Sequence, residues 1–352
     1  MASRAVTMKD IAEHLGVSIN TVHKAVAGKP GVSEGTRARV LRYAEECGYQ
    51  RNMEASALRR KDLTLVACLP ALTPGSRFFY GPMWQGCRDF AEEYRAQGIR
   101  VVEEAYEEDS FDRTLEALAC RAEGGERIDG MVTIPARSAL SCALLERIAR
   151  TGTCLVFASG DEPSVAGRYG AVMADFEVAG ALMAEQARNL LSGAGEVLLL
   201  AGDAYKDSHY RVARSFHEHV EQDTPGVRVR DVYGYHNLAA LRADIERELS
   251  AGTIGLVCSV FARASAPLRA ALEATGKAGS VPVIANDVFD ETVAGLRDGV
   301  FTNLVYKDPR RQAYLALRMV GDHLLLGTDP AERVVRSRVS LVFKSTLGYY
   351  EP

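Results

Sequence analysis

From residue 63 onward, short apolar segments alternate with amphipathic segments, and this alternation constrains the fold more than any other feature. Apolar runs of strand length that are separated by helical periodicity indicate βαβ units, and therefore parallel, doubly wound sheets. Such sheets bind ligands at the carboxyl ends of their strands. The expected strands are 63–69, 99–103, 130–134, 153–157, 169–173, 196–201, 227–233, 254–259, 281–285 and 301–305, enough for two sheets. The expected helices are 83–97, 110–122, 138–150, 177–192, 208–221, 238–250, 266–275, 290–298 and 309–326.

The first 50 residues follow a different pattern, that of three short helices joined by tight turns. Thr7 followed by Asp10 has the spacing of a capping box and predicts a helix over 8–15. Ser18 is an N-cap for a second helix that ends before residue 28, and Ser33 begins a third that stops at residue 48. Two short helices with a supporting third form a helix-turn-helix, whose second helix fits the DNA major groove.

Charge is divided unevenly between this head and the rest of the chain. Residues 1–61 carry eleven cationic and six acidic side chains, which gives a net charge of +5. The remainder carries 31 cationic and 40 acidic side chains, which gives a net charge of −9. A short basic head on a long acidic body suggests a polyanion-binding module joined to a part that does not bind polyanions. The alternative is a generic three-helix bundle with solvated polar faces.

In a helix-turn-helix the first turn of the second helix meets the edges of the bases. Asn20 can bond adenine, Lys24 can reach guanine acceptors and Ile19 can contact a thymine methyl group. Phosphate contacts set the position of a protein on DNA without reading the sequence. We expect phosphate contacts from Ser18, Thr21, His23, Lys29 and Thr36. The capping residue Thr7 is also expected to bind DNA.

The head resembles the N-terminal signature of the lactose-repressor/galactose-repressor (LacI/GalR) family over residues 5–60. The matching residues are Thr7-Met8-Lys9-Asp10-Ile11-Ala12, Gly16-Val17-Ser18, Thr21-Val22, Gly28-Lys29, Val32-Ser33, Thr36-Arg37, Val40 and Gly48-Tyr49. The resemblance implies that Asn52, Ala55 and Leu58 lie in a hinge helix that binds DNA, with Leu58 of each subunit wedged into a minor-groove base step. The alternative is an ordinary linker helix.

The head departs from the family pattern at two places. His23 and Lys24 stand where the family usually has Ser-Arg, so a single ammonium replaces a guanidinium fork and the operator can differ. Arg51 and Glu54 stand where the family favours proline and an apolar residue. A Glu54 that faced its twofold mate would weaken the pairing of two hinge helices.

The body resembles the two-lobed periplasmic sugar-binding proteins that supply the effector domain of this family. The resemblance implies an aromatic platform for a sugar face within Phe78-Phe79-Tyr80, and polar contacts that follow the expected strands. Four of the implied residues have a structural alternative to ligand binding. Phe79 can belong to the core, Asp175 and Asp287 can cap helices, and Arg211 can form an ion pair at the surface. The implied effector-binding residues are Phe79, Arg137, Asp175, Arg211, Asp287 and Lys307, and the cations Arg137 and Lys307 would tolerate an acidic sugar.

Several other classes of protein lack support in the sequence. There is no Walker lysine motif, no nucleotide-binding glycine fingerprint and no Gly-x-Ser-x-Gly elbow, so we expect neither an enzyme nor a cofactor. The seven cysteines contain no Cys-x-x-Cys, and His217 and His219 lie two apart on an expected helix, so no metal site is expected. The absence of an apolar signal segment or membrane-length run favours the cytoplasm.

The expected fold is an all-α helix-turn-helix headpiece plus a two-lobed α/β domain of the periplasmic-binding-protein (type I) kind, each lobe a doubly wound parallel sheet. The expected domains are 1–50 for DNA binding, 51–61 for the hinge and 62–352 for effector binding and dimerisation. Within the last, the expected N-lobe is 62–161 with 289–322, and the expected C-lobe is 162–288 with 323–345.

These expectations describe a homodimeric regulator that binds a palindromic operator and a sugar or sugar-like effector, most simply a repressor of a carbohydrate-utilisation operon. The effector can act as an inducer or as a corepressor. Two competing hypotheses are a small-molecule enzyme with an N-terminal oligomerisation bundle and a solute-binding module without DNA activity. The basic head and the hinge pattern favour regulation over both.

Overall fold

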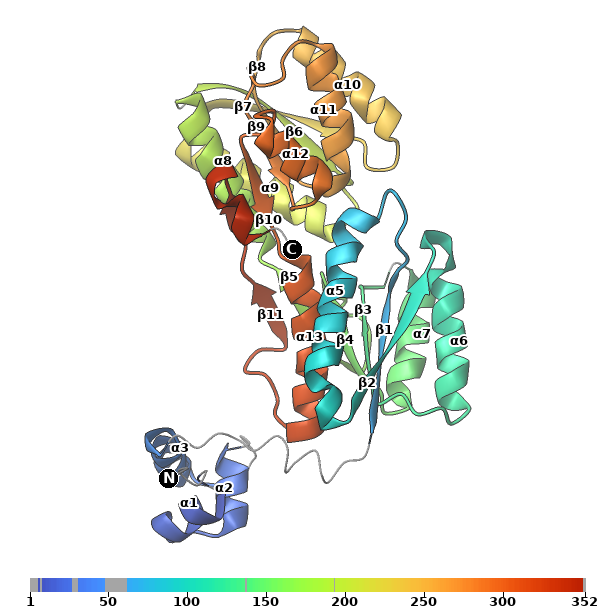
Figure 1. The fold of residues 1–352 in the computed structure, drawn as a ribbon, viewed down its shortest axis with the longest axis vertical. Helices are drawn as coiled ribbons and strands as arrows, with labels where there is room; N and C mark the ends of the chain where they lie inside the picture. Colours follow the sequence, from blue (N-terminus) through green and yellow to red (C-terminus); the bar gives the residue numbers. More distant parts are fainter. Residues whose placement is uncertain are drawn as a thin grey trace.

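The computed structural model describes residues 6, 8–26, 31–47, 62–136, 138–192 and 194–350, and shows a small helical headpiece and two α/β lobes (Figure 1). Each lobe has its own sheet, as the alternation of apolar and amphipathic segments predicted. Several residues singled out in the sequence lie outside the described residues, namely Thr7, Lys29, Arg51, Asn52, Glu54, Ala55, Leu58 and Arg137.

The headpiece is the predicted bundle of three helices around one small core. Ile11, Val22 and Val40, one from each helix, are fully buried and hold the helices together. The amide of Thr21 donates to the Ser18 hydroxyl at 3.0 Å, so the predicted N-cap of the second helix is confirmed. The helices are α1 (Met8–Leu15), α2 (Ile19–Val26) and α3 (Glu34–Glu46).

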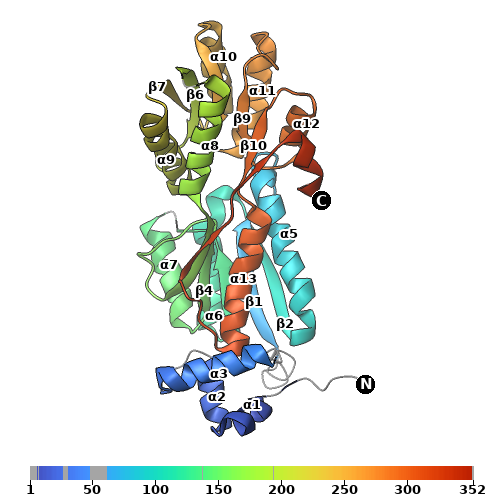
Figure 2. The same ribbon diagram turned by 90° about the vertical axis from the view of Figure 1, so that its left-hand side faces the viewer.

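The lobe next to the headpiece, called the N-lobe here, is built on a six-stranded parallel sheet in the order β11-β5-β4-β3-β1-β2. Helices α5 and α13 cover one face of the sheet, and α6 and α7 cover the other (Figures 1 and 2). Its strands are β1 (Leu63–Pro70), β2 (Ile99–Tyr106), β3 (Gly130–Thr133), β4 (Cys154–Ala158), β5 (Arg168–Ala174) and β11 (Val334–Ser337). Its helices are α5 (Arg77–Tyr94), α6 (Phe111–Glu123), α7 (Ala139–Arg150) and α13 (Pro309–Leu326), with 3-10 turns η1 (Arg95–Gln97) and η2 (Glu108–Ser110).

The second lobe, the C-lobe, has a six-stranded sheet in the order β12-β10-β9-β8-β6-β7, in which only the short edge strand β12 runs antiparallel among the described strands. Its strands are β6 (Ala194–Gly202), β7 (Gly226–Tyr233), β8 (Ile254–Ser259), β9 (Val283–Asn286), β10 (Asn303–Tyr306) and β12 (Ser340–Val342). Its helices are α8 (Phe176–Leu191), α9 (Asp207–Asp223), α10 (Leu238–Ser250), α11 (Ser265–Ala274) and α12 (Asp290–Arg297), with η3 (Ala262–Ala264) and η4 (Lys344–Tyr349).

The chain passes between the two sheets three times, after β5, after β10 and after β11. These crossings correct the predicted lobe boundaries. β5 pairs with β4 and so belongs to the N-lobe, while β10 pairs with β9 and so belongs to the C-lobe. A parallel strand takes its place in a sheet from its hydrogen-bonded neighbours, which the order of elements along the chain does not reveal.

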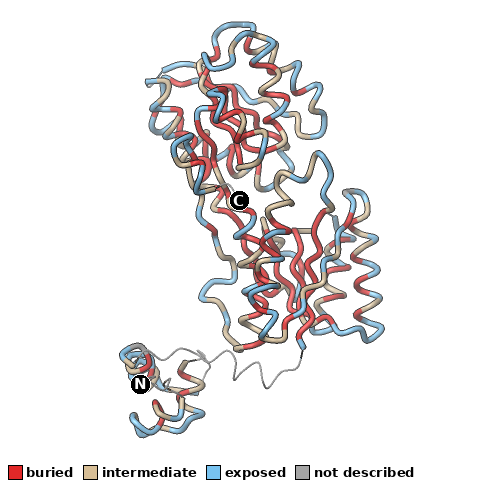
Figure 3. Tube along the Cα trace, viewed as in Figure 1, coloured by how far each residue is buried: buried red, intermediate tan, exposed pale blue. Residues whose placement is uncertain are grey.

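Both sheets are buried on their two faces, as parallel sheets require. Every residue of β1 is buried, and the buried residues in Figure 3 gather along the strands and the inner faces of the helices. Two separate apolar clusters result, one for each lobe. Among the described helices, none combines the length and the apolar character that a membrane crossing needs.

Candidate functional site

The first turn of α2 presents the residues predicted to meet bases. Ile19 is 51% exposed and Asn20 is exposed, whereas Val22 is buried in the headpiece core. An apolar side chain that is half exposed beside an exposed amide is a surface suited to the edges of bases. Lys24 is partly buried one turn further along the helix.

Three of the predicted phosphate-contact residues take part in helix caps. The Ser18 and Thr21 hydroxyls lie 2.8 Å apart, and the Ser33 hydroxyl donates to Thr36 Oγ1 at 2.9 Å. Arg37 donates to the carbonyl of Ala25 at 3.1 Å and so ties α3 to the end of α2. The caps hold these hydroxyls at the start of α2 and α3, which orders the turn ahead of the exposed first turn of α2.

The polar residues of the C-lobe gather at the carboxyl ends of its strands, the edge where parallel sheets bind ligands. Lys206 follows β6, Tyr235 follows β7, Arg263 follows β8, Asp287 follows β9 and Lys307 follows β10. Consecutive strands of one parallel sheet therefore each supply one polar side chain. We call these five residues the strand-end cluster.

Asp287 and Lys307 form a buried ion pair within this cluster. The Lys307 ammonium lies 3.5 Å from the Asp287 carboxylate and donates to the carbonyl of Val260 at 3.3 Å. Asp287 is 2% exposed and has a left-handed backbone, with φ at 61°. Burial lowers the pKa of Lys307, and the Asp287 carboxylate opposes that shift. Sequence analysis predicted both residues as effector contacts, and the structure brings them together.

Tyr235 contacts two cations in the same cluster. The Lys206 ammonium lies 4.7 Å from the centre of the Tyr235 ring and donates to its hydroxyl at 3.4 Å. The Arg263 guanidinium lies 4.9 Å from the same ring centre. His209, buried beside them, packs against Tyr235 and Phe261 and accepts from the amide of Asp203 at 3.2 Å.

Several buried polar atoms of this region have no hydrogen-bond partner among the residues that the structure describes. They are Asn286 Oδ1 at the end of β9, Arg263 Nε in η3 and Ser265 Oγ at the start of α11. Native proteins pair nearly all such atoms, so each unpaired one calls for an explanation. Their position at strand ends matches the edge at which a ligand binds.

Arg211 lies away from the strand-end cluster. Its guanidinium donates to both oxygens of Glu177, at 2.8 Å for each bond, and so joins α9 to α8. Hydrogen bonding to Arg211 lowers the pKa of Glu177. This geometry corresponds to the alternative of an ion pair, and it leaves an effector role for Arg211 as an untested prediction.

Asp175 and Phe79 also adopt the structural roles that were the alternatives to effector binding. Asp175 lies in the first crossing between the lobes, and its carboxylate accepts from the amide of Val178 at 3.2 Å as the N-cap of α8. Phe79 packs partly buried against the N-lobe core. Its neighbour Phe78 reaches the other lobe, where its ring centre lies 4.6 Å from that of Phe289.

Other contacts also join the lobes beside the strand-end cluster. Arg77 at the start of α5 donates to Glu291 of α12 at 2.6 Å. A Cβ atom placed on Gly75 of the N-lobe would lie 3.6 Å from the Arg263 guanidinium. Arg263 therefore lies close to the N-lobe, and this part of the cluster is adjacent to both lobes.

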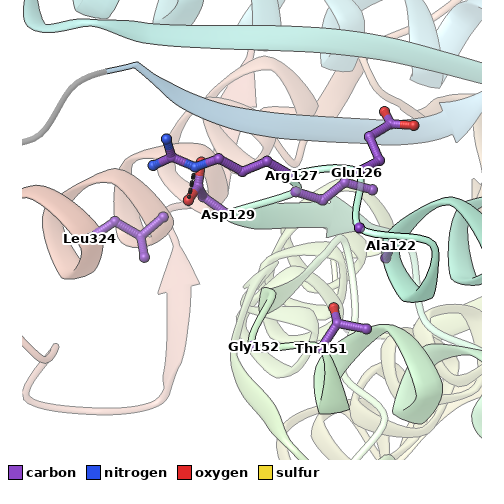
Figure 4. A pocket seen from close by; sticks show the side chains of 9 residues that line it. Ala122, Glu126, Arg127, Asp129, Thr151, Gly152 and Leu324 are labelled. Atoms are coloured by element: carbon purple, nitrogen blue, oxygen red, sulfur yellow. Dashed lines mark hydrogen bonds and ion pairs between the residues drawn. The ribbon is translucent and has the colours of Figure 1, made fainter.

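A separate pocket of about 360 Å³ lies at the opposite, amino ends of β3 and β4 (Figure 4). Its lining includes an ion pair of Arg127 with Asp129 at 2.9 Å, and Asp129 also accepts from the amide of Thr64 at 2.8 Å. The rest of the lining is Ala122, Gly125, Glu126, Ile128, Thr151, Gly152 and Leu324. Because parallel sheets bind ligands at the other edge, this pocket is not our candidate site.

Sequence analysis missed Lys206, Tyr235 and Arg263. A usable signal existed, because each of the three follows a correctly predicted strand of the C-lobe by a few residues. Asp287 and Lys307, which the family resemblance implied, follow strands in the same way, so an inspection of the end of every strand would have selected these three as well. No group of three or more His, Cys, Asp or Glu side chains suited to a metal ion occurs in the described part of the chain.

The fold and the strand-end cluster define a class: a two-lobed α/β ligand-binding protein that carries a helix-turn-helix headpiece. The chain belongs to the periplasmic binding protein domain family, whose model matches residues 71–328, and residues 7–52 match the bacterial regulatory proteins of the lacI family. These matches confirm the resemblance of both parts of the chain.

Two curated relatives and one solved structure illustrate the match. Catabolite control protein A of Priestia megaterium is 31% identical over 127 residues, 36% of each chain. The maltose regulon regulatory protein MalI of Escherichia coli (strain K12) is 42% identical over 99 residues, 28% of each chain. The matched segments thus span about a third of these relatives. An ABC transporter solute binding protein from Burkholderia graminis, in complex with D-arabinose, shares the fold at a TM-score of 0.72 and 19% identity over 83% of this chain and 99% of that one.

Proposed function

We propose that this chain is a ligand-responsive, sequence-specific DNA-binding transcriptional regulator rather than an enzyme, and a repressor of a carbohydrate-utilisation operon. The observation that carries the proposal is the exposed first turn of α2, with Ile19 and Asn20 presented over a buried headpiece core. The lacI-family match of residues 7–52 supports it, as does a relative named as the regulatory protein of a maltose regulon. Such a regulator acts in the cytoplasm, where its operator is.

The effector-binding part of the proposal rests on the two lobes. A sugar or sugar-like effector binds between them at the strand ends, with Asp287, Lys307, Asp175, Arg137 and Phe79 as proposed contacts. A ligand changes DNA affinity only by its different affinity for two arrangements of the lobes. Comparing operator affinity with and without the ligand decides whether it acts as an inducer or as a corepressor.

The dimeric state is part of the same proposal. Two headpieces related by a twofold axis would bind the two halves of a palindromic operator. In each subunit the proposed hinge residues Asn52, Ala55 and Leu58 would enter the minor groove between the half-sites.

Selection from a library of random duplexes, followed by sequencing, tests DNA recognition for an operator of any sequence. We expect the full chain to enrich a twofold-symmetric sequence whose affinity falls steeply with salt, because phosphate contacts release counterions. No enriched sequence, or a salt-independent affinity, would contradict the proposal.

Two variants of the headpiece separate reading of bases from binding of the backbone. Asn20→Ala should relax the preference at one base pair of each half-site, at a cost of about 1–3 kcal/mol for the preferred base. Thr36→Ala should instead weaken binding to all sequences to a similar extent, because a phosphate contact carries no sequence information. Identical selection profiles for Asn20→Ala and the unaltered chain would exclude base reading by that residue.

A further inference from the structure

The two cations around Tyr235 have no carboxylate partner among the described residues, although they lie among the polar residues at the strand ends. Within the described ranges, no acidic side chain forms an ion pair with Lys206 or Arg263, although both lie against the same ring. The acids nearest in the sequence and at the neighbouring strand ends are engaged elsewhere. Asp203 pairs with His236 at 2.9 Å, Asp207 with Arg211 and Asp287 with Lys307.

The positive potential at this place is strong enough to act on neighbouring groups. Burial raises the pKa of Tyr235, yet Lys206 and Arg263 outweigh burial and leave that pKa below its ordinary value. Burial also lowers the pKa of His209 well below its ordinary value, with Lys206 and Lys307 adding to the shift. Groups that titrate near these cations are thus driven towards negative or neutral forms.

Arg263 also carries a donor with no acceptor. Its Nε is buried and has no hydrogen-bond partner in the described part of the structure. A guanidinium presents its N–H groups as a planar fork that matches the oxygens of a phosphate or carboxylate. The side chain lies close to Gly75 of the N-lobe, so an acceptor that bonded this fork would lie where the two lobes meet.

We propose that Lys206, Arg263 and the Tyr235 hydroxyl form a subsite for an oxyacid anion, and that the effector is therefore an anionic sugar derivative, phosphorylated or carboxylated, rather than a neutral sugar. This inference rests on the proposed effector role of the strand-end cluster. Both cations lie against the Tyr235 ring, and the anion supplies the negative charge that no acidic side chain of the described residues gives them. The Asp287–Lys307 pair beside it remains available for hydroxyl groups of the same ligand.

Inorganic phosphate is the probe that tests the subsite, whatever the natural effector is. Calorimetric titration of the full chain with phosphate, at an ionic strength fixed with sodium chloride, should give saturable binding with one site per chain. Arg263→Gln and Lys206→Met should each weaken that binding at least about tenfold, as expected for the loss of a charge-assisted hydrogen bond. Arg188→Gln, which removes an exposed cation from α8 of the same lobe, should leave it unchanged.

Acetate in place of phosphate distinguishes the two sources of the anion. Tighter binding of phosphate supports a phosphorylated ligand, and tighter binding of acetate supports a carboxylated one. Wild-type chain that binds neither anion, or Arg263→Gln and Lys206→Met chains that bind them as tightly as wild type, would overturn the inference. Circular dichroism of both variants confirms that they fold.

Operator binding, measured in the same samples, distinguishes failure of this inference from failure of the proposed function. Loss of anion binding with retained operator selection would reject the anionic effector and leave the regulator standing. Operator binding that is absent from the unaltered chain would reject the regulator, whatever the anion does.

Discussion

At the scale of single residues, most predicted effector contacts already have a structural task. Asp175 caps α8, Arg211 joins α9 to α8 and Asp287 neutralises the buried Lys307. Asp287 combines a left-handed backbone with almost complete burial, which a structure retains only when its surroundings stabilise it. Replacing such a residue tests folding as well as binding, so its effect on ligand response alone would be ambiguous.

His209 makes the stability of the protein depend on pH. Burial, followed by the charges of Lys206, Lys307 and His236, lowers the pKa of His209 well below 6.5. Above pH 6.5 the side chain is neutral in both states, and below it only the unfolded chain gains a proton. The free energy of unfolding should therefore fall by up to about 1.4 kcal/mol per pH unit below 6.5. Urea titrations followed by circular dichroism between pH 5 and 7.5 measure this slope.

Two variants assign that slope to its source. His209→Asn keeps an acceptor for the amide of Asp203 and should make stability less sensitive to acid than in the unaltered chain. His217 has a raised pKa because it is hydrogen-bonded to Asp231, so it contributes stability below pH 6.5 that is lost as the pH rises through its folded value. His217→Asn should thus steepen the loss in acid. Parallel slopes for all three chains would show that His209 does not carry the effect.

At the scale of elements, periodicity predicted every strand that lies in the middle of a sheet, because those strands are continuous apolar runs. It missed the edge strands β11 and β12, because each has only three or four residues and is partly exposed at the edge of its sheet. It also placed the start of α5 at residue 83, whereas the helix begins at Arg77 and contains Pro82. Proline ordinarily marks a helix boundary, and here the first turn forms before it.

Close packing of α5 against α13 depends on one glycine, which no propensity could indicate. A Cβ atom on Gly86 would lie 2.0 Å from the carbonyl oxygen of Arg310. Gly86→Ala must therefore move one helix backbone, and we expect the free energy of unfolding to fall by about 1–3 kcal/mol. Fluorescence of Trp84, the single tryptophan of the chain and buried in the same helix, reports urea unfolding of this lobe.

Gly81 provides the matched control in the same helix. Apart from its chain neighbours, a Cβ atom there would meet no atom within 4 Å, so the only steric cost of Gly81→Ala is that of a Cβ before Pro82. We expect that variant to lose clearly less stability than Gly86→Ala, because no helix backbone has to move. Equal losses of stability in the two variants would mean that the contact with α13 does not set the requirement for glycine at position 86.

At the scale of the whole molecule, the three crossings explain why two lobes were predictable but their boundaries were not. Alternation along the chain indicates βαβ units, yet the sheet that each unit joins is decided by pairing between strands distant in sequence. The predicted boundary at 162 separated β5 from its partner β4. The crossings also place Asp175 and Lys307 in the connections between the lobes, where a bound ligand would affect their relative position.

A partly exposed ion pair contributes to the contact between the lobes, and its contribution can be tested by mutation. Arg77 is 48% exposed and lies 2.6 Å from Glu291 and 3.9 Å from Asp290 across the lobe boundary. Because an exposed pair contributes at most about 1 kcal/mol, its removal alone would change little, whereas a reversed charge at position 77 adds repulsion by two acids. We expect Arg77→Glu to weaken the contact between the lobes and to speed hydrogen exchange of the amides in segments 71–78 and 289–291. Glu291→Arg added to Arg77→Glu should slow that exchange again.

Arg88→Glu is the matched control, because it reverses an ion pair with Glu103 inside the N-lobe, and it should leave hydrogen exchange in segment 289–291 unaffected. Exchange in 289–291 that was unchanged by Arg77→Glu, or changed as much by Arg88→Glu, would show that this contact does not hold the lobes together.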